Sequence, residues 1–232
     1  MTATDVRYNQ DMRRASRHTQ TPAGDLRSAA RSGHLVSVTS RPKGVDPVEG
    51  RVVLVGLRWA VVHRLHRDVV LDGYVAVPTL QVSQVVDLDG RDWRARELTH
   101  TSRSDDAPHV DPTTTTTLLR SAAAEFGVLE VAARRSRVLV SSTGEIERIV
   151  GRQLVFTPLR AGANVEARPL VLIPIPEIVR VEFGSSSTDA LARARGHRSP
   201  AARPGVTERA VTELRGRGPD DDRRPQRPPA VA

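Results

Sequence analysis

Apolar residues in the middle of the chain fall into short runs rich in valine, and Gly, Pro and Asp separate these runs. Runs of four to eight residues with β-branched side chains and such boundaries are typical of strands rather than helices. In the first half of the chain they predict five strands, at residues 35–40, 51–57, 59–65, 74–77 and 82–88.

The connections between these strands carry turn residues. Asp72-Gly73 predicts a turn with a positive φ, and Pro78 is expected to end the fourth strand because proline has no N–H for a ladder hydrogen bond. Only residues 79–81 separate Pro78 from Val82, which leaves room for a single 3₁₀ turn and not for a helix.

The second half of the chain repeats the order of the first. Residues 51–65 overlay residues 145–159 without a gap, and Val77-Pro78 matches Ile173-Pro174 after an insertion of two residues. These matches predict an internal duplication. The alternative is coincidence, because short valine-rich strands resemble one another.

A short helix is expected ahead of each set of strands. Ser28-Ala29-Ala30 precedes the first strand, as Ser121-Ala122-Ala123 precedes the sixth. Over residues 116–125 leucine and alanine recur on one side of a helix, and the threonines from Thr113 onward offer an N-cap.

The expected fold is therefore mainly β, with two duplicated small five-stranded barrels, each preceded by a short helix. Both ends of the chain lack apolar periodicity, so we expect them to be disordered. Trp93 and Leu98 are expected to pin part of the linker. The predicted segments are a tail at 1–24, a first barrel at 25–88, a linker at 89–115, a second barrel at 116–184 and an Arg/Pro-rich tail at 185–232.

This order of elements resembles the small barrels of the Sm-like and SH3-like type, and more loosely tandem barrels of uncharacterised bacterial proteins. The Sm-like resemblance implies RNA contacts in the loop between the second and third strands and at an Arg-Gly pair near the fourth and fifth. Those places read Gly56-Leu57-Arg58 and Val150-Gly151-Arg152, then Pro78-Thr79-Leu80 and Pro174-Ile175-Pro176. Because the Arg-Gly pair is missing, the resemblance implies a fold and no binding site.

The chain has 232 residues, no cysteine and a formal net charge of +8. Without cysteine there is neither a disulfide framework nor a thiolate zinc site, which suits a reducing compartment. The first thirty residues are polar and lack the apolar stretch of a secretory signal or a membrane span. We therefore expect a cytoplasmic protein with no membrane partner.

The basic surplus lies at the two ends of the chain. Residues 1–32 hold six arginines against three acidic residues, and residues 185–232 hold ten against six. Between them, 19 basic residues face 18 acidic ones. Arginine also exceeds lysine in the way that the codon usage of a GC-rich genome favours, so the charge alone does not predict a basic face.

Candidate catalytic motifs are few. His63 and His66 form an H-x-x-H, but residues three apart on a strand point to opposite faces and do not share a metal. Ser40-Arg41-Pro42-Lys43 matches S-x-x-K, yet its proline argues against the helical turn that such a pair needs. No phosphate loop, metalloprotease, hydrolase or dinucleotide motif is present. The sequence predicts no enzyme, no cofactor, no metal site and no small-molecule substrate.

Two kinds of binding remain. Arg134, Arg135 and Arg137 form a cluster that can contact the phosphates of RNA or DNA, or that is simply a charged, solvated loop, the interpretation we favour. Two Trp, two Tyr and three Phe are few for a base-stacking platform. Small barrels also leave strand edges open, which can accept a strand from a protein partner or a second copy. We expect a non-catalytic binding or scaffolding protein acting through its barrels, by protein–protein interaction or self-association. The alternative is RNA or DNA binding through arginine-rich tails and barrel loops.

Overall fold

We describe the protein from a computed structural model, over residues 21–41, 45–66, 69–89, 93–94, 97–98, 107–136, 138–159 and 169–196. The predicted N-terminal tail, except for its last four residues, lies outside this described part, and so do Lys43, Arg137 and residues 197–232.

In the first half a short helix leads into five strands. Helix α2 (Pro22–Ser32) starts after Thr21, whose side chain accepts a hydrogen bond from the Gly24 N–H, and it ends at Gly33 in the left-handed conformation. The strands are β1 (Leu35–Ser40), β2 (Val48–Val55), β3 (Trp59–Leu65), β4 (Leu71–Pro78) and β5 (Val82–Asp87). The predicted 3₁₀ turn is confirmed as η1 (Thr79–Gln81), directly after Pro78.

The second half has the same order. Helix α4 (Thr115–Phe126) begins with a capping box between Thr114 and Thr117 and ends before Gly127. The strands are β6 (Val128–Arg135), β7 (Val138–Val150), β8 (Gln153–Pro158), β9 (Val171–Pro174) and β10 (Ile178–Phe183), with the 3₁₀ turn η2 (Ile175–Glu177) before β10.

The strand pairings of the two halves share one register. β2 pairs with β3 as β7 pairs with β8, and the bulge in each ladder falls at an equivalent place, between Val52 and Leu54 and between Ile146 and Arg148. The bulge between β1 and β5 likewise has a counterpart between β6 and β10. A bulge inserts one extra residue and bends its strand, so its repetition is a specific structural match. The residue equivalences predicted from the sequence are confirmed.

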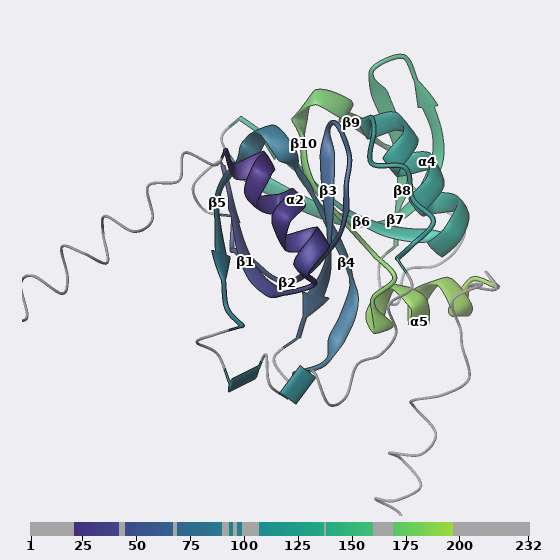
Figure 1. The fold of residues 1–232 in the computed structure, drawn as a ribbon. Helices are drawn as coiled ribbons and strands as arrows, with labels where there is room; N and C mark the ends of the chain where they lie inside the picture. The colour runs from purple at the N-terminus through teal and green to yellow at the C-terminus, as the bar shows by residue number, and fades with distance from the viewer. Residues whose placement is uncertain are drawn as a thin grey trace, which may run out of the picture. The chain divides into compact units, whose positions relative to one another are not determined.

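The prediction of two separate five-stranded barrels is wrong. All ten strands form one antiparallel sheet in the order β5-β1-β2-β3-β4-β10-β6-β7-β8-β9, and this sheet is not closed. The strand β4 pairs with β10 of the other half rather than with β5 of its own (Figure 1). The outer backbone groups of β4 and β10 thereby satisfy each other, and the two halves become one sheet.

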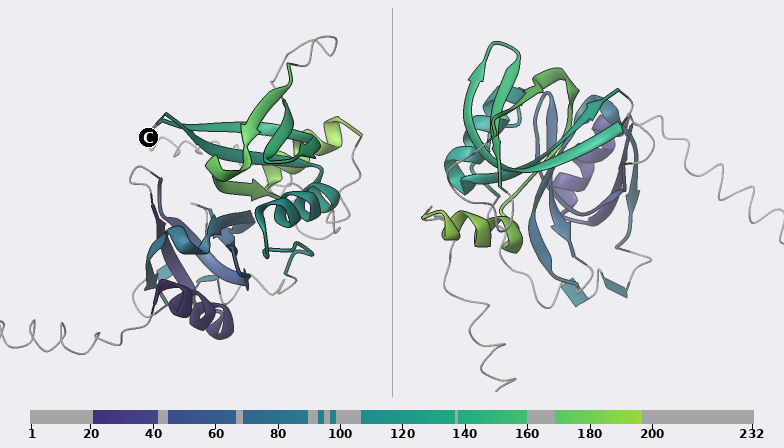
Figure 2. Two further views of the ribbon diagram at one scale, coloured as in Figure 1. Left: turned by 90° about the horizontal axis from the view of Figure 1, so that it is seen from above. Right: turned by 180° about the vertical axis from the view of Figure 1, so that it is seen from behind.

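The core explains why β3 and β4 read as continuous apolar runs. Val62 and Val75 lie in a cluster with α2, whereas Val61 and Ala76 lie in a second cluster with α4 and the strands of the second half. These two strands are therefore buried on both faces, which removes the alternation of apolar and polar residues. In Figure 2, α2 lies with the strands of the first half and α4 with those of the second.

The linker is only partly pinned in the way that the sequence predicts. Leu98 is fully buried with Leu35 and Leu65, but Trp93 is 65% exposed, so its predicted role is wrong. The linker is held at its end by Trp59, whose N–H donates to the Pro112 carbonyl (3.1 Å) and whose indole Nε1 donates to Thr115 Oγ1 (3.1 Å).

Two sequence expectations fail together at the end of β10. The tail expected from residue 185 begins instead with helix α5 (Ser186–Ala194), which Ser185 and Thr188 cap reciprocally. Gly73 has the expected positive φ of +69°, but it lies inside β4 and not in a turn. A Cβ on Gly73 would lie 2.7 Å from Ser185 Cα, so the close approach of α5 requires this glycine.

Candidate functional site

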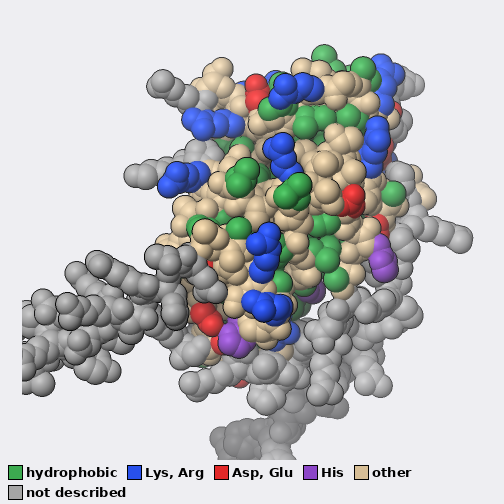
Figure 3. All heavy atoms as spheres, turned by 45° about the horizontal axis from the view of Figure 1, so that its top comes forward, with side chains coloured by type: hydrophobic (Ala, Val, Ile, Leu, Met, Phe, Trp, Pro, Cys, Tyr) green, Lys and Arg blue, Asp and Glu red, His purple; other side chains and the backbone are tan. Residues whose placement is uncertain are grey.

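The arginine cluster predicted from the sequence is divided by the structure. Arg134 and Arg135 are exposed at the end of β6, and Arg137 lies outside the described residues. Arg134 lines a surface hollow, while the guanidinium of Arg135 donates to the main-chain carbonyl of Leu172 in β9. On the face drawn in Figure 3, basic side chains are interspersed with apolar ones and do not form a continuous patch.

The hollow, of about 350 Å³, lies where the two halves meet. Arg41 and Gln81 of the first half line it together with Arg134 and Glu177 of the second. The repeated registers make Arg41 equivalent to Arg134, and Gln81 equivalent to Glu177. Two guanidinium groups can hold an anion there, although the Glu177 carboxylate lowers the positive potential.

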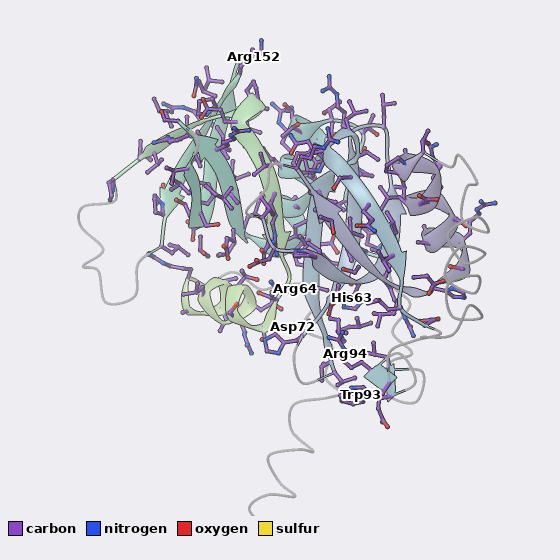
Figure 4. The ribbon with its side chains drawn as sticks, turned by 90° about the vertical axis from the view of Figure 1, so that its left-hand side faces the viewer. His63, Arg64, Asp72, Trp93, Arg94 and Arg152 are labelled. Carbon is purple, nitrogen blue, oxygen red and sulfur yellow. The ribbon has the colours of Figure 1, made fainter. Side chains whose placement is uncertain are left out.

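A polar cluster lies where β4 meets β10, and one of its ion pairs joins Arg64 of β3 to Glu182 of β10. Arg64 Nη1 lies 2.6 Å from Glu182 Oε2, and Arg180 Nε lies 2.7 Å from Glu182 Oε1, with all three side chains largely buried. Beside them, Asp72 accepts hydrogen bonds from the Ser186 N–H (2.8 Å) and hydroxyl (3.0 Å). Figure 4 shows Arg64 and Asp72 in one region and Arg152 at the far end of the β7–β8 hairpin. We call the pairing of β4 with β10, with this cluster, the joined edge.

His63 lies next to this cluster but is unsuited to metal binding or to general-base catalysis near pH 7. Burial, together with the positive charge of Arg51, lowers its pKa to about 4, and Asp72 opposes this shift. Its ring stacks on Tyr74 with 4.6 Å between ring centroids. The part of the chain that the structure describes holds no group of three or more potential metal ligands, and the H-x-x-H forms no such group with a third residue.

One end of the sheet is β5. The Leu88 N–H donates to the Leu35 carbonyl (2.8 Å), and the alternation of an antiparallel ladder then turns the backbone N–H and C=O of Val85 away from β1. Among the described residues, no strand lies on this outer side of β5. Its backbone can therefore accept a further strand.

The other end of the sheet is β9. The Ile175 N–H donates to the Arg152 carbonyl (2.9 Å), and the same alternation turns the backbone of Leu172 away from β8. The Leu172 side chain is 57% exposed and that of Leu170, just before the strand, 58%. Together, the outer sides of β5 and β9 are the open edges of the sheet.

Sequence reasoning missed the residues that distinguish the joined edge from the open edges. Glu182 and Arg180 interrupt an apolar strand, and a charge pair in a buried run is a signal that could have marked them as partners of Arg64. The bond from Arg135 to Leu172 has no such signal, because 37 residues separate donor and acceptor.

Comparison with protein-family models, curated proteins and solved structures finds no match to this chain. In the described part, no helix has the length and apolarity needed to cross a membrane.

Proposed function

We propose that this is a non-catalytic binding or scaffolding protein that takes up extended segments of protein partners at its open edges. The observation that carries the proposal is that β5 and β9 end the described sheet and turn backbone groups outward. In strand addition the main chain supplies affinity, and side chains such as Leu172 supply contact area.

The polar groups of the molecule support a binding role over a catalytic one. Arg64 and Arg180 each form an ion pair with Glu182, and Asp72 accepts hydrogen bonds from Ser186 at the start of α5. His63 is neutral at pH 7, stacked and largely buried. The Arg64–Glu182 ion pair and the Asp72–Ser186 hydrogen bonds connect the two halves.

The test is affinity capture from native lysate, with and without nuclease, using the parent protein, Leu172→Lys and Val150→Lys. Both positions are 57% exposed, but Val150 lies at the β7–β8 turn, away from the open edges. We expect a protein partner that survives nuclease and the Val150→Lys change and is lost with Leu172→Lys. A partner retained equally by both variants would place the binding surface elsewhere.

A second candidate function is nucleic-acid binding, because equivalent arginines of both halves, Arg41 and Arg134, line one hollow. Phosphate contacts weaken steeply with salt. If this function is correct, changing both residues to Ser should reduce affinity for single-stranded RNA and its salt dependence, whereas Arg148→Ser should not. Salt-independent capture of a protein partner favours the first proposal instead.

A further inference from the structure

The joined edge and the open edges are built from the same two kinds of strand. In the internal repeat β4 is equivalent to β9, and β10 is equivalent to β5. Inside the chain, β4 of the first half pairs with β10 of the second. The two strands left at the ends are therefore one β4-type edge, in β9, and one β10-type edge, in β5.

Resting on the proposed role in strand addition, we propose that the partner is a second copy of this chain: β9 of one molecule pairs with β5 of the next, head to tail. The joined edge is the template, since it shows that these two kinds of edge fit each other. The backbone groups also point the right way. Val85 and Leu172 turn their N–H and C=O groups outward, and their counterparts Val181 and Ala76 lie opposite each other in the joined edge.

The template fixes the register of the contact. In the joined edge Val181 pairs with Ala76, Glu182 with Val75 and Phe183 with Tyr74. Carried to the open edges by the repeat, Val85 pairs with Leu172, Val86 with Val171 and Asp87 with Leu170 of the next copy. In this register Val86 and Val171 form the non-hydrogen-bonded pair, whose side chains lie close together.

The side chains at the open edges are mostly apolar, and Asp87, which the register places opposite Leu170, is hydrogen-bonded to His34 Nδ1 (2.8 Å). Val86 stands where the joined edge has Glu182, and Pro158 stands where it has Arg64, so pairing buries no charge at these positions. Leu170 and Leu172, each more than half exposed, would be covered. Without the ion pairs of the joined edge the contact is weaker, and we expect it to depend on concentration.

The Arg135 side chain occupies part of the open β9 edge. Its guanidinium donates to the Leu172 carbonyl, which is the acceptor that the Val85 N–H of a second copy would use. A charged side chain on an edge strand is a known means of discouraging strand addition. Arg135 must leave this carbonyl before the next copy pairs, so its removal should strengthen association.

Sedimentation velocity of the full chain tests the association itself. We expect the mass to rise with protein concentration, on the order of 100 μM being needed for a contact of modest size. A head-to-tail contact closes into a ring, with a plateau in mass, or continues as a filament without one. Leu172→Lys should stay monomeric, and the equally exposed Val150→Lys should behave as the parent.

Cysteine pairs test the register, because the chain contains no cysteine of its own. Mixing Val86→Cys molecules with Val171→Cys molecules under oxidation should yield a disulfide-linked dimer, since non-hydrogen-bonded pairs lie within disulfide reach. Val85→Cys mixed with Val171→Cys places the thiols on opposite faces of the sheet and should cross-link much less.

Arg135→Ala should tighten self-association several-fold. The same substitution at the neighbouring residue, Arg134→Ala, is the control and should leave self-association unchanged. A protein that stays monomeric and forms no Val86–Val171 cross-link overturns self-association. If that protein still captures a partner that Leu172→Lys loses, the proposed function stands with a different occupant. Loss of all edge-dependent binding would overturn both.

Discussion

The joined edge and the open edges have the same backbone geometry but different side chains. The joined edge places Glu182 between Arg64 and Arg180, and the start of α5 meets β4 at Asp72. Phe183 packs 5.1 Å from Phe126 and 5.8 Å from Tyr74, measured between ring centroids. At the equivalent positions, the open edges have Val86, the exposed Leu170 and Leu172, and the hydrogen bond from Arg135 to the Leu172 carbonyl. The backbone ladder is alike at both kinds of edge, so we expect the side chains to set how strongly each pairs.

The two halves also differ in how completely their apolar side chains are buried. The first half is buried on both faces of β3 and β4, by α2 on one side and by the second half on the other. The second half carries most of the exposed apolar side chains, among them Leu170, Leu172 and Val150. The repeat therefore presents two copies of one ladder with different surroundings.

The largest effect should come from breaking the equivalence of Val61 and Val155, which are 0% and 5% exposed. Changing either one to Asp buries an unpaired charge and should cost several kcal/mol, enough to unfold the protein. Urea unfolding should show a similar loss for both variants and little for Val150→Asp. A tolerated Val155→Asp would mean that the two positions are not equivalent.

Replacing His63 by the residue at the equivalent position of the second half tests the comparison of the two halves through the pH dependence of stability. Thr157 stands at the equivalent position and is buried with its hydroxyl on Glu147 (2.7 Å). Because the folded protein lowers the pKa of His63 from 6.5 to about 4, the unfolded chain binds the proton first as pH falls. Stability from neutral His63 is complete above pH 6.5 and is lost as pH falls toward 4, by about 3 kcal/mol.

We therefore expect His63→Thr to flatten the dependence of unfolding free energy on pH between 6.5 and 4. Denaturant titrations across this range measure the slope directly. An unchanged slope would assign the acid sensitivity to groups other than His63.

Gly73 is a backbone feature that distinguishes the joined edge from the open edge at β9. Its Cβ would lie 2.7 Å from Ser185 Cα, and its φ is +69°, so Gly73→Ala should cost about 2 kcal/mol. Gly151→Ala is the control, because Gly151 also has a positive φ but no atom within 4 Å of a Cβ. Thermal unfolding should place Gly73→Ala below Gly151→Ala, and equal melting temperatures would show that α5 moves away at little cost.

The smallest effect should be the coupling between Arg64 and Glu182 across β4. A double-mutant cycle with Arg64→Ala and Glu182→Ala should give a coupling of about 1–2 kcal/mol, since the pair is short and largely buried. Arg180 retains part of the compensation for Glu182 when Arg64 is changed. A coupling near zero would leave the aromatic contacts as the main link of the joined edge.

The sequence by itself determined the local features of this protein. The order and approximate positions of the strands, the 3₁₀ turn after Pro78, the threonine-capped helix and the repeat could be predicted, because short-range periodicity and turn residues encode them. The proposed binding site could be predicted only in kind: open strand edges were expected, but not which strands would carry them.

Only the tertiary structure decided how the two halves meet. A short helix and five strands fit equally well in a closed barrel or in a shared sheet, since both satisfy the same local hydrogen bonds. The choice rests on contacts far apart in sequence, such as Val181 with Ala76 and Arg64 with Glu182, together with the close approach of Ser185 to Gly73. No local pattern encodes these contacts, because each of these residues fits the pattern of its own strand whether or not the distant partner is present.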